Sequence, residues 1–149
     1  MAMILKMYRK GVTDLWCLEK QGRFAGLAIT INSPEVVLLD YFAVEKSQRC
    51  GGIGRCALGK LMELYAHRGF FVEIENTREE TPEQPLRLRR KRFYLSCGLE
   101  EMGTEAELFG VNMELLGVRC RLDYAAYREF YRVHYNPWAA EHIRPCSLR

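Results

Sequence analysis

A glycine-rich connection between an apolar segment and an amphipathic one constrains the fold of this chain more than any other feature. The apolar segment, Glu35 to Val44, is rich in β-branched and aromatic residues and predicts a central strand covered on both faces. Ile53 to Arg68 has apolar residues at helical spacing and predicts a helix that ends at Gly69. Phe70 to Glu75 predicts a short strand. Strand, helix and strand in this order predict a right-handed crossover between two parallel strands.

The connection itself, QRCGGIGRCAL (Gln48 to Leu58), predicts a site for a diphosphate. Its glycines leave the backbone open to a ligand and tolerate positive φ, so that successive amide N–H groups can face one anion. The helix that follows adds its unpaired N-terminal amides and the positive end of its dipole. A tight strand-to-helix turn would use the same glycines. The connection has neither the G-K-[ST] ending of a nucleotide triphosphate loop nor the G-x-G-x-x-G spacing of a dinucleotide fold.

Two motifs resemble those of the GNAT superfamily of acetyltransferases. Arg49-x-x-Gly52-x-Gly54 resembles the family's R/Q-x-x-G-x-G/A signature, and RFYLSCGLEEMG (Arg92 to Gly103) resembles its later helix with the strand that follows. The resemblance covers about residues 15–118. It implies that acetyl-coenzyme A binds as co-substrate, with its diphosphate on the loop amides and its pantetheine arm beside the preceding strand. The residues that it implies for cofactor binding are Phe42, Val44, Arg49, Cys50, Gly51, Gly52, Ile53, Gly54, Arg55 and Tyr94.

The same resemblance places Tyr94 where many members of the family have a general acid. When an amine attacks the thioester, the departing thiolate needs a proton, and a tyrosine with a pKa of about 10 is protonated at neutral pH. The alternative is a core tyrosine, because apolar residues lie at helical spacing around it. A carboxylate near the ends of the two parallel strands is expected to take a proton from the amine, and Asp40, Glu73 and Glu75 are the candidates. For each, a salt bridge to the basic segment Arg87 to Arg92 is an equally good interpretation.

Periodicity and turn residues predict the remaining elements of a single α/β domain, residues 1–149, with a mixed and twisted sheet. Residues 119–149 are expected to form a C-terminal helix and tail. That helix carries aromatic side chains on one face, which is a candidate contact surface for a homodimer. The elements are a hairpin of Leu15 to Glu19 and Phe24 to Ile31, a helix from Leu86 to Cys97, an antiparallel pair of Leu99 to Phe109 and Val111 to Val118, and a helix from Asp123 to His134.

Composition argues against several classes of protein. Hydrophobic residues make up 48% and charged residues 28%, as in an ordinary globular domain, and no apolar run approaches the roughly 20 residues of a membrane span. Lys6, Arg9 and Lys10 interrupt the N-terminal apolar stretch where a signal peptide would continue, which predicts a cytoplasmic protein. The six cysteines include no C-x-x-C pair, so reduced and mostly packed thiols are expected, with no metal site. Cys50, in the glycine loop, is a candidate for a reactive thiol.

The charge balance does not indicate nucleic acid. The net charge is only +3, from 22 basic and 19 acidic side chains. The run RLRRKR would suit phosphates, but coenzyme A also carries them. One of Arg55, Arg89 or Lys91 is expected to face its 3′-phosphate.

These features predict an N-acetyltransferase that moves the acetyl group to an unidentified small-molecule or peptide amine by direct attack in a ternary complex. A catalytically silent acyl-coenzyme A-binding module that acts through a partner is the alternative. The predicted hairpin begins at residue 15, which leaves little room before it for the strand and two helices that usually shape the family's acceptor pocket. The acceptor side is then open, completed by a second subunit, or built partly by the C-terminal helix.

Overall fold

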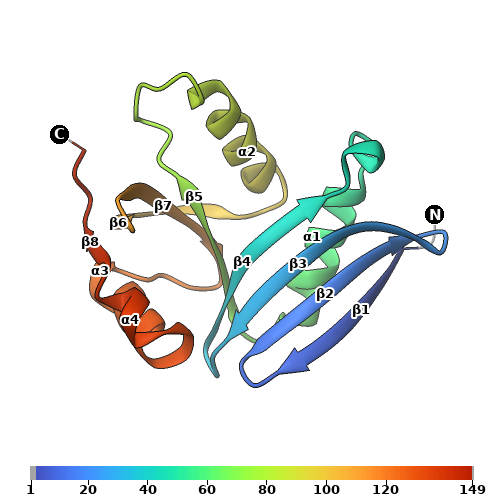
Figure 1. The fold of residues 1–149 in the computed structure, drawn as a ribbon, viewed down its shortest axis with the longest axis horizontal. Helices are drawn as coiled ribbons and strands as arrows, with labels where there is room; N and C mark the ends of the chain where they lie inside the picture. Colours follow the sequence, from blue (N-terminus) through green and yellow to red (C-terminus); the bar gives the residue numbers. More distant parts are fainter. Residues whose placement is uncertain (1–2, 149) are drawn as a thin grey trace. The chain divides into compact units, whose positions relative to one another are not determined.

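The computed structural model describes residues 3–148 and divides the chain into two compact units, with the boundary after residue 70. The fold is α/β, with a mixed sheet and flanking helices, which confirms the predicted fold class (Figure 1). The elements are β1 (Met3–Lys10), β2 (Thr13–Lys20), β3 (Arg23–Asn32), β4 (Val36–Val44), η1 (Lys46–Gln48), α1 (Ile53–Leu64), β5 (Gly69–Glu75), α2 (Gln84–Ser96), β6 (Glu100–Leu108), β7 (Val111–Val118), α3 (Tyr124–Phe130), η2 (Tyr131–Tyr135), α4 (Pro137–Ala140) and β8 (Ile143–Pro145).

The first unit is built on the antiparallel strands β1 to β4, which pair in chain order. The β2–β3 hairpin confirms the predicted one, but β1 was not predicted. It pairs with β2 along its whole length and turns back through Gly11 and Val12. The residues of β1 from Lys6 onward are exposed, so the strand lacks the alternation of buried and exposed side chains that marks a strand in a sequence.

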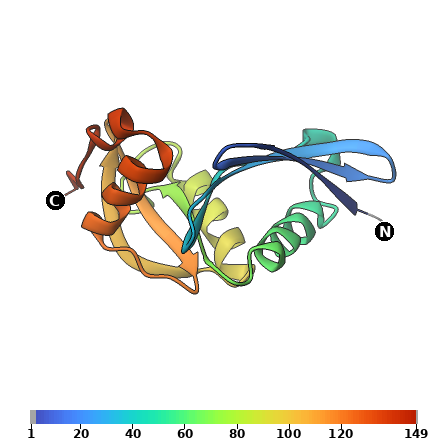
Figure 2. The ribbon, with the colours of Figure 1, turned by 90° about the horizontal axis from the view of Figure 1, so that it is seen from below.

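α1 packs along one face of this sheet (Figure 2). Its buried side chains Ile53 and Ala57 contact Met3, Leu18 and Ala25 of the strands. Apolar contacts with the sheet therefore fix the start of the helix, while the residues just before it, Cys50 to Gly52, are exposed to solvent.

β4, α1 and β5 follow one another in the predicted order of strand, helix and strand, with one change in the helix. α1 ends at Leu64, four residues before the predicted end, and a turn closed by the Arg68 amide on the Tyr65 carbonyl follows it. Gly69 is the first residue of β5 and not a helix stop. Its amide donates to the carbonyl of Glu35, the residue before β4, at 2.9 Å.

A chain of buried hydrogen bonds crosses the first unit beneath the end of α1. The indole N–H of Trp16 donates to Thr30, and the Thr30 hydroxyl lies 2.8 Å from that of Tyr65. The Tyr65 hydroxyl donates to the fully buried carboxylate of Asp14 at 2.7 Å. Burial, with the hydrogen bond to Asp14, raises the pKa of Tyr65 to about 12, so it stays a donor at any ordinary pH.

The second unit has the strand order β5-β7-β6-β8. The β6–β7 hairpin turns at Phe109 and Gly110, both with positive φ, and confirms the predicted antiparallel pair. α2 begins two residues before the predicted start, with Pro85 in its first turn, where a missing N–H costs nothing. Gly98, at φ 100°, ends the helix as predicted.

The C-terminal segment differs from the predicted single helix. After α3 the chain makes a π-helical turn, η2, and then a short helix, α4, whose N-cap is Asn136. The expected aromatic contact surface is wrong, because Tyr127, Phe130 and Tyr131 are 0%, 5% and 2% exposed. They cover β5, where the ring of Phe71 lies edge-on to Tyr127 and Phe130. An apolar strand face needs such a cover, and the aromatic stripe provides it.

Candidate functional site

The second half of β4 leaves the regular sheet. β3 and β4 are in register up to Leu39 and again from Tyr41, so Asp40 forms a β-bulge. The expectation of a strand covered on both faces holds only before the bulge: Leu39 is 4% exposed, but Tyr41 is 50% exposed. Beyond it, Phe42 and Val44 pack their side chains on the core cluster beneath α1. Such packing leaves the strand backbone as the part of both residues that could contact a ligand.

The neighbouring strand holds this part of β4 in place by a close backbone approach. Gly26 of β3 lies so near β4 that an added Cβ would be 2.2 Å from the carbonyl oxygen of Ala43. The Glu45 amide donates to the carbonyl of Ala25 at 2.7 Å and closes the end of the strand pair. The backbone at Phe42 to Val44 is thus rigidly placed.

The glycine loop between β4 and α1 has the backbone conformation that an anion site needs. Cys50 and Gly52 both have positive φ, 66° and 76°. Gly52 is the N-cap of α1, and because it has no side chain it places no acceptor of its own on the first-turn amides. An added Cβ at Gly52 would meet no atom within 4 Å, which leaves open space at this helix start.

The side chains of the loop divide into anchors and exposed residues. Ile53 is 1% exposed and fixes the helix start in the core. The Arg49 guanidinium turns back, and its Nε donates to the carbonyl of Val44 at 3.1 Å. Cys50, Gly51 and Arg55 are exposed. Two cysteines are exposed, Cys50 in the loop and Cys56 on the helix, and the other four are half-buried. The expectation that most of the thiols are packed in the core is therefore wrong.

Among the cations proposed for the 3′-phosphate of coenzyme A, Lys91 is engaged elsewhere. Its ammonium group forms ion pairs with Glu101 and with the buried Glu114, the latter at 2.5 Å. Burial lowers the pKa of Lys91, but hydrogen bonds to the two glutamates outweigh it, so the net shift is upward. Arg55, on the first turn of α1, and Arg89 on α2 are both exposed.

Tyr94 lies on α2 and is 8% exposed. Burial raises the pKa of its phenol, and the charge of Arg90 offsets this in part. The phenol is therefore protonated at neutral pH, as a proton donor must be. Its ring packs edge-on to Phe93 at 5.4 Å, a contact that a core tyrosine would also make.

Of the three carboxylates considered as proton acceptors, Glu75 forms the salt bridge to the basic segment that was the alternative to a catalytic role. Its Oε2 lies 2.7 Å from Nε of Arg87 on α2, and the same guanidinium pairs with Glu79 at 2.6 Å. Asp40 is half-buried at the bulge of β4.

Glu73 has partners that sequence reasoning did not find. Oε1 accepts hydrogen bonds from the hydroxyls of Tyr127, at 2.9 Å, and Tyr131, at 2.5 Å. The two tyrosines are one helical turn apart, which is the spacing that puts two hydroxyls on one face. That spacing was visible in the sequence, but it indicated only an aromatic face.

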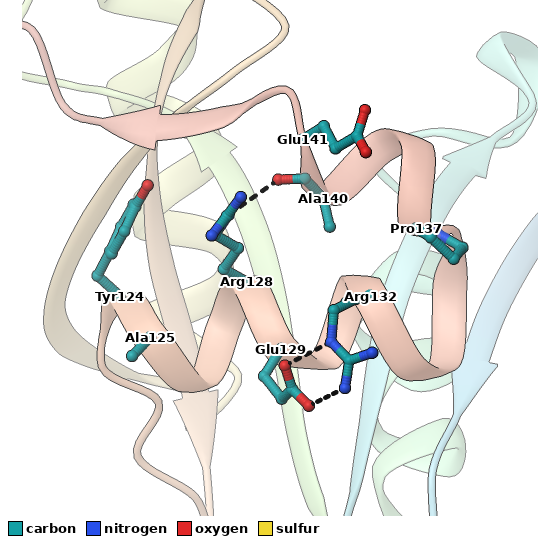
Figure 3. A pocket seen from close by; sticks show the side chains of 8 residues that line it. All are labelled: Tyr124, Ala125, Arg128, Glu129, Arg132, Pro137, Ala140 and Glu141. Atoms are coloured by element: carbon teal, nitrogen blue, oxygen red, sulfur yellow. Dashed lines mark hydrogen bonds and ion pairs between the residues drawn. The ribbon is translucent and has the colours of Figure 1, made fainter.

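A pocket in the second unit is lined by none of the predicted site residues. It holds about 460 Å³ between α3 and α4 and is lined by charged side chains, among them Arg128, Arg132 and Glu141 (Figure 3). Arg128 donates to the carbonyl of Ala140, and Arg132 pairs with Glu129. Both arginines of the pocket thus already have partners among the residues that line it.

Neither a membrane-crossing helix nor a metal-binding group is found in residues 3–148. None of the helices there has the length and apolar character that a membrane crossing needs. In the same residues, no group of three or more His, Cys, Asp or Glu side chains is placed to hold a metal ion.

The protein is an α/β protein in which a bulged strand leads into a loop with two left-handed residues. The helix that follows has a glycine as its N-cap, and such a loop is suited to binding an anion. No protein-family model matches the chain, and no curated protein matches it by sequence. Many solved structures match its fold.

Three of these structures can be compared in detail. A Bacteroides thetaiotaomicron protein assigned to the GNAT family of acetyltransferases is 19% identical over 84% of this chain and 74% of its own, with a TM-score of 0.68. A Bacillus subtilis acetyltransferase in complex with coenzyme A is 11% identical over 78% of this chain and 98% of its own, with a TM-score of 0.60. A GNAT acetyltransferase from Elizabethkingia anophelis with acetyl-coenzyme A bound is 12% identical over 79% and 98%, with a TM-score of 0.57. The chain has the fold of the GNAT acetyltransferases.

Proposed function

We propose that the protein is an N-acetyltransferase, which moves an acetyl group from acetyl-coenzyme A to an amine by direct attack in a ternary complex. The observation that carries the proposal is the loop before α1, with Cys50 and Gly52 at positive φ and a glycine as the N-cap of the helix. Two proteins with the same fold were solved with coenzyme A or acetyl-coenzyme A.

The loop residues have distinct parts in this proposal. The amides from Arg49 to Arg55 bind the diphosphate, because the glycines leave the loop backbone open and Gly52 begins the helix without a capping side chain. The backbone of Phe42 and Val44 binds the pantetheine arm, since their side chains point into the core. The Arg55 side chain is the proposed partner of the 3′-phosphate. Coenzyme A supplies the activated thioester, and the chain itself supplies binding and proton transfer.

Tyr94 is the proposed general acid. As the C–S bond of the thioester breaks, its phenol gives a proton to the departing thiolate. The raised pKa keeps the phenol protonated across the neutral and mildly alkaline range. The proposed proton acceptor is one of three carboxylates: Asp40, Glu73 or Glu75.

The acceptor is an amine of unidentified class. Proteins with this fold include a spermidine/spermine N-acetyltransferase from Vibrio cholerae and a ribosomal-protein alanine N-acetyltransferase from Escherichia coli. A polyamine and a peptide with a free N-terminus are therefore the first acceptors to test.

Calorimetric titration with coenzyme A, followed by an acceptor screen, tests the proposed function. Binding is expected at sub-millimolar concentration, with loss of the thioester's ultraviolet absorbance when spermidine or an alanine-terminated peptide is added. Thioester absorbance is the better readout, because Cys50 and Cys56 are exposed and would react with thiol reagents. Failure to bind coenzyme A would refute the proposal. Binding without turnover of any amine would favour the catalytically silent module.

Replacing Tyr94 by phenylalanine is expected to lower kcat by about 100-fold, because the thiolate then leaves without a proton donor. The KM for acetyl-coenzyme A should stay within about twofold, since the phenol acts on the departing sulfur and not on the diphosphate. Steady-state kinetics at pH 7 to 9 measure both constants. Tyr8→Phe is the matched control, because Tyr8 lies on β1 and is 65% exposed. An unchanged kcat in Tyr94→Phe would identify Tyr94 as a core tyrosine only.

A further inference from the structure

The C-terminal helix places two hydroxyl groups on one carboxylate oxygen. Tyr127 and Tyr131, here called the tyrosine pair, both donate to Oε1 of Glu73, at 2.9 and 2.5 Å. Glu73 is half-buried in the middle of β5, whereas both rings are almost completely buried. A buried phenol that finds no acceptor is costly, so the position of the carboxylate and the packing of the helix determine each other.

The rings of the tyrosine pair are fixed by aromatic neighbours on both sides. Tyr127 lies edge-on to Phe71 of β5 at 6.5 Å and edge-on to Tyr131 at 5.2 Å. Tyr131 in turn stacks on Tyr135 at 4.8 Å. With their rings held in this way, the hydroxyls have little freedom, and Oε1 of Glu73 is held at one point.

The helix changes its winding at the second of these tyrosines. η2 begins at Tyr131, and the Asn136 amide donates to the Tyr131 carbonyl at 2.7 Å, a spacing of five residues. Single π-helical turns are rare, and many of them occur at functional sites. The turn begins at Tyr131, the second of the two residues that donate to Glu73.

We infer that Tyr127 and Tyr131 are positioning residues for Glu73, which acts as the catalytic carboxylate of the acetyl transfer. The inference rests on the proposed function and names the group that receives the proton. The C-terminal segment thereby supplies part of the acceptor side, one of the three arrangements that the sequence left open. Glu73 is preferred because two hydroxyl groups on one helix face hold its carboxylate oxygen.

The proton balance of this step is complete. The ammonium form of the acceptor gives one proton to Glu73, and the freed nitrogen lone pair forms the C–N bond at the thioester carbonyl. The C–S bond breaks, and the thiolate takes a proton from Tyr94. The new amide nitrogen gives up its extra proton to the Tyr94 phenolate through water, and Glu73 releases its proton to solvent. One proton is released for each acetyl group transferred.

Kinetics of the full-length protein with spermidine, or the alanine-terminated peptide if that is the acceptor, test the inference. Glu73→Gln is expected to lower kcat by about 100-fold or more. Tyr127→Phe and Tyr131→Phe should each lower kcat by about 10-fold and leave the KM for acetyl-coenzyme A unchanged. In the Glu73→Gln background, adding Tyr131→Phe should change kcat by less than about twofold, because the residue acts only through the carboxylate.

Tyr124→Phe is the matched control, because Tyr124 is on the same helix and donates to the Ile143 carbonyl at 3.0 Å, away from Glu73. It should keep the wild-type kcat. Wild-type kcat in both tyrosine variants would overturn the inference, as would a full additional loss in the Glu73→Gln background. An equal loss in Tyr124→Phe would show a general effect on the helix and would also overturn it.

Failure of the proposed function has a different signature. Wild-type protein that turns over no amine would overturn both the acetyltransferase proposal and the catalytic role of Glu73. The contact itself has a separate readout in Tm. The losses caused by Glu73→Ala and Tyr131→Phe should not add in the double variant, because each change alone removes the hydrogen bond between the two side chains.

Discussion

Gly52→Asp is expected to weaken binding of coenzyme A by at least 100-fold while leaving the protein folded. The carboxylate would lie at the start of α1, where the diphosphate is proposed to bind. Two unit charges about 4 Å apart near a protein surface repel by about 4 kcal/mol, and about 1.4 kcal/mol corresponds to a tenfold change in affinity. Because an added Cβ at Gly52 meets no atom within 4 Å, the change itself causes no clash. Calorimetric titration measures the loss.

Gly11→Asp is a closely matched control for this change. Gly11 has a φ of 60°, near the 76° of Gly52, and an added Cβ there also meets nothing within 4 Å. Both substitutions place aspartate in the left-handed region, which this residue tolerates better than most. Gly11 lies in the β1–β2 turn, at the opposite end of β2 from Lys20, which approaches the loop at Gly51. Equal affinities in the two variants would place the coenzyme elsewhere.

Asp14→Ala is expected to cost about 3 kcal/mol or more of folding free energy, and to lower the Tm by roughly 10 °C. The reason is that the buried carboxylate accepts from three groups: Tyr65, Asn32 and Arg9. Its removal leaves the Tyr65 hydroxyl and the Asn32 amide without their acceptor inside the protein. Thermal unfolding followed by circular dichroism measures the change.

The pH dependence of this loss has a defined sign. Burial acts to raise the pKa of Asp14, but hydrogen bonds from Tyr65, Arg9 and Asn32 outweigh it and hold the pKa below its usual value. The stabilisation is therefore fully present above the unfolded pKa of about 3.9 and is lost as the pH falls through the lower folded pKa. The Tm difference between wild type and Asp14→Ala should be constant near neutrality and narrow below about pH 4.

Glu19→Ala, on the same strand, is the control for this stability change. Its carboxylate pairs with Lys6, which is exposed, so the Tm should change by no more than about 2 °C. A similar loss of Tm in both variants would mean that the buried hydrogen bonds of Asp14 stabilise the fold no more than an exposed ion pair does.

The elements that sequence reasoning found are those whose local chemistry allows one interpretation. The glycines before Ile53 and the helical spacing after it predicted both the loop and α1. By contrast, the helix predicted from Asp123 to His134 stops just before Asn136-Pro137, a pair that can end a helix but can also start one. In the structure Asn136 accepts from the Trp138 amide and Pro137 takes the first helical position, so the pair begins α4. A local sequence does not decide between these two uses.

The site shows the same division between local and long-range information. The loop residues are consecutive and could be predicted as a group. The contact of Glu73 with Tyr127 and Tyr131 joins residues more than 50 positions apart. An aromatic face has the same period whether it covers a strand or meets a partner. Only the fold shows that this face covers Phe71 and contacts Glu73.

β8 has a consequence for any truncated or tagged form of the protein. Its residues Ile143–Pro145 pair with the end of β6, Ala106 to Leu108, and so occupy backbone N–H and C=O groups that would otherwise form an open sheet edge. Pro145 has no N–H to offer the next strand, which discourages further pairing. Cutting the chain before Ile143 would uncover that edge and invite self-association, so affinity tags are better kept away from this end.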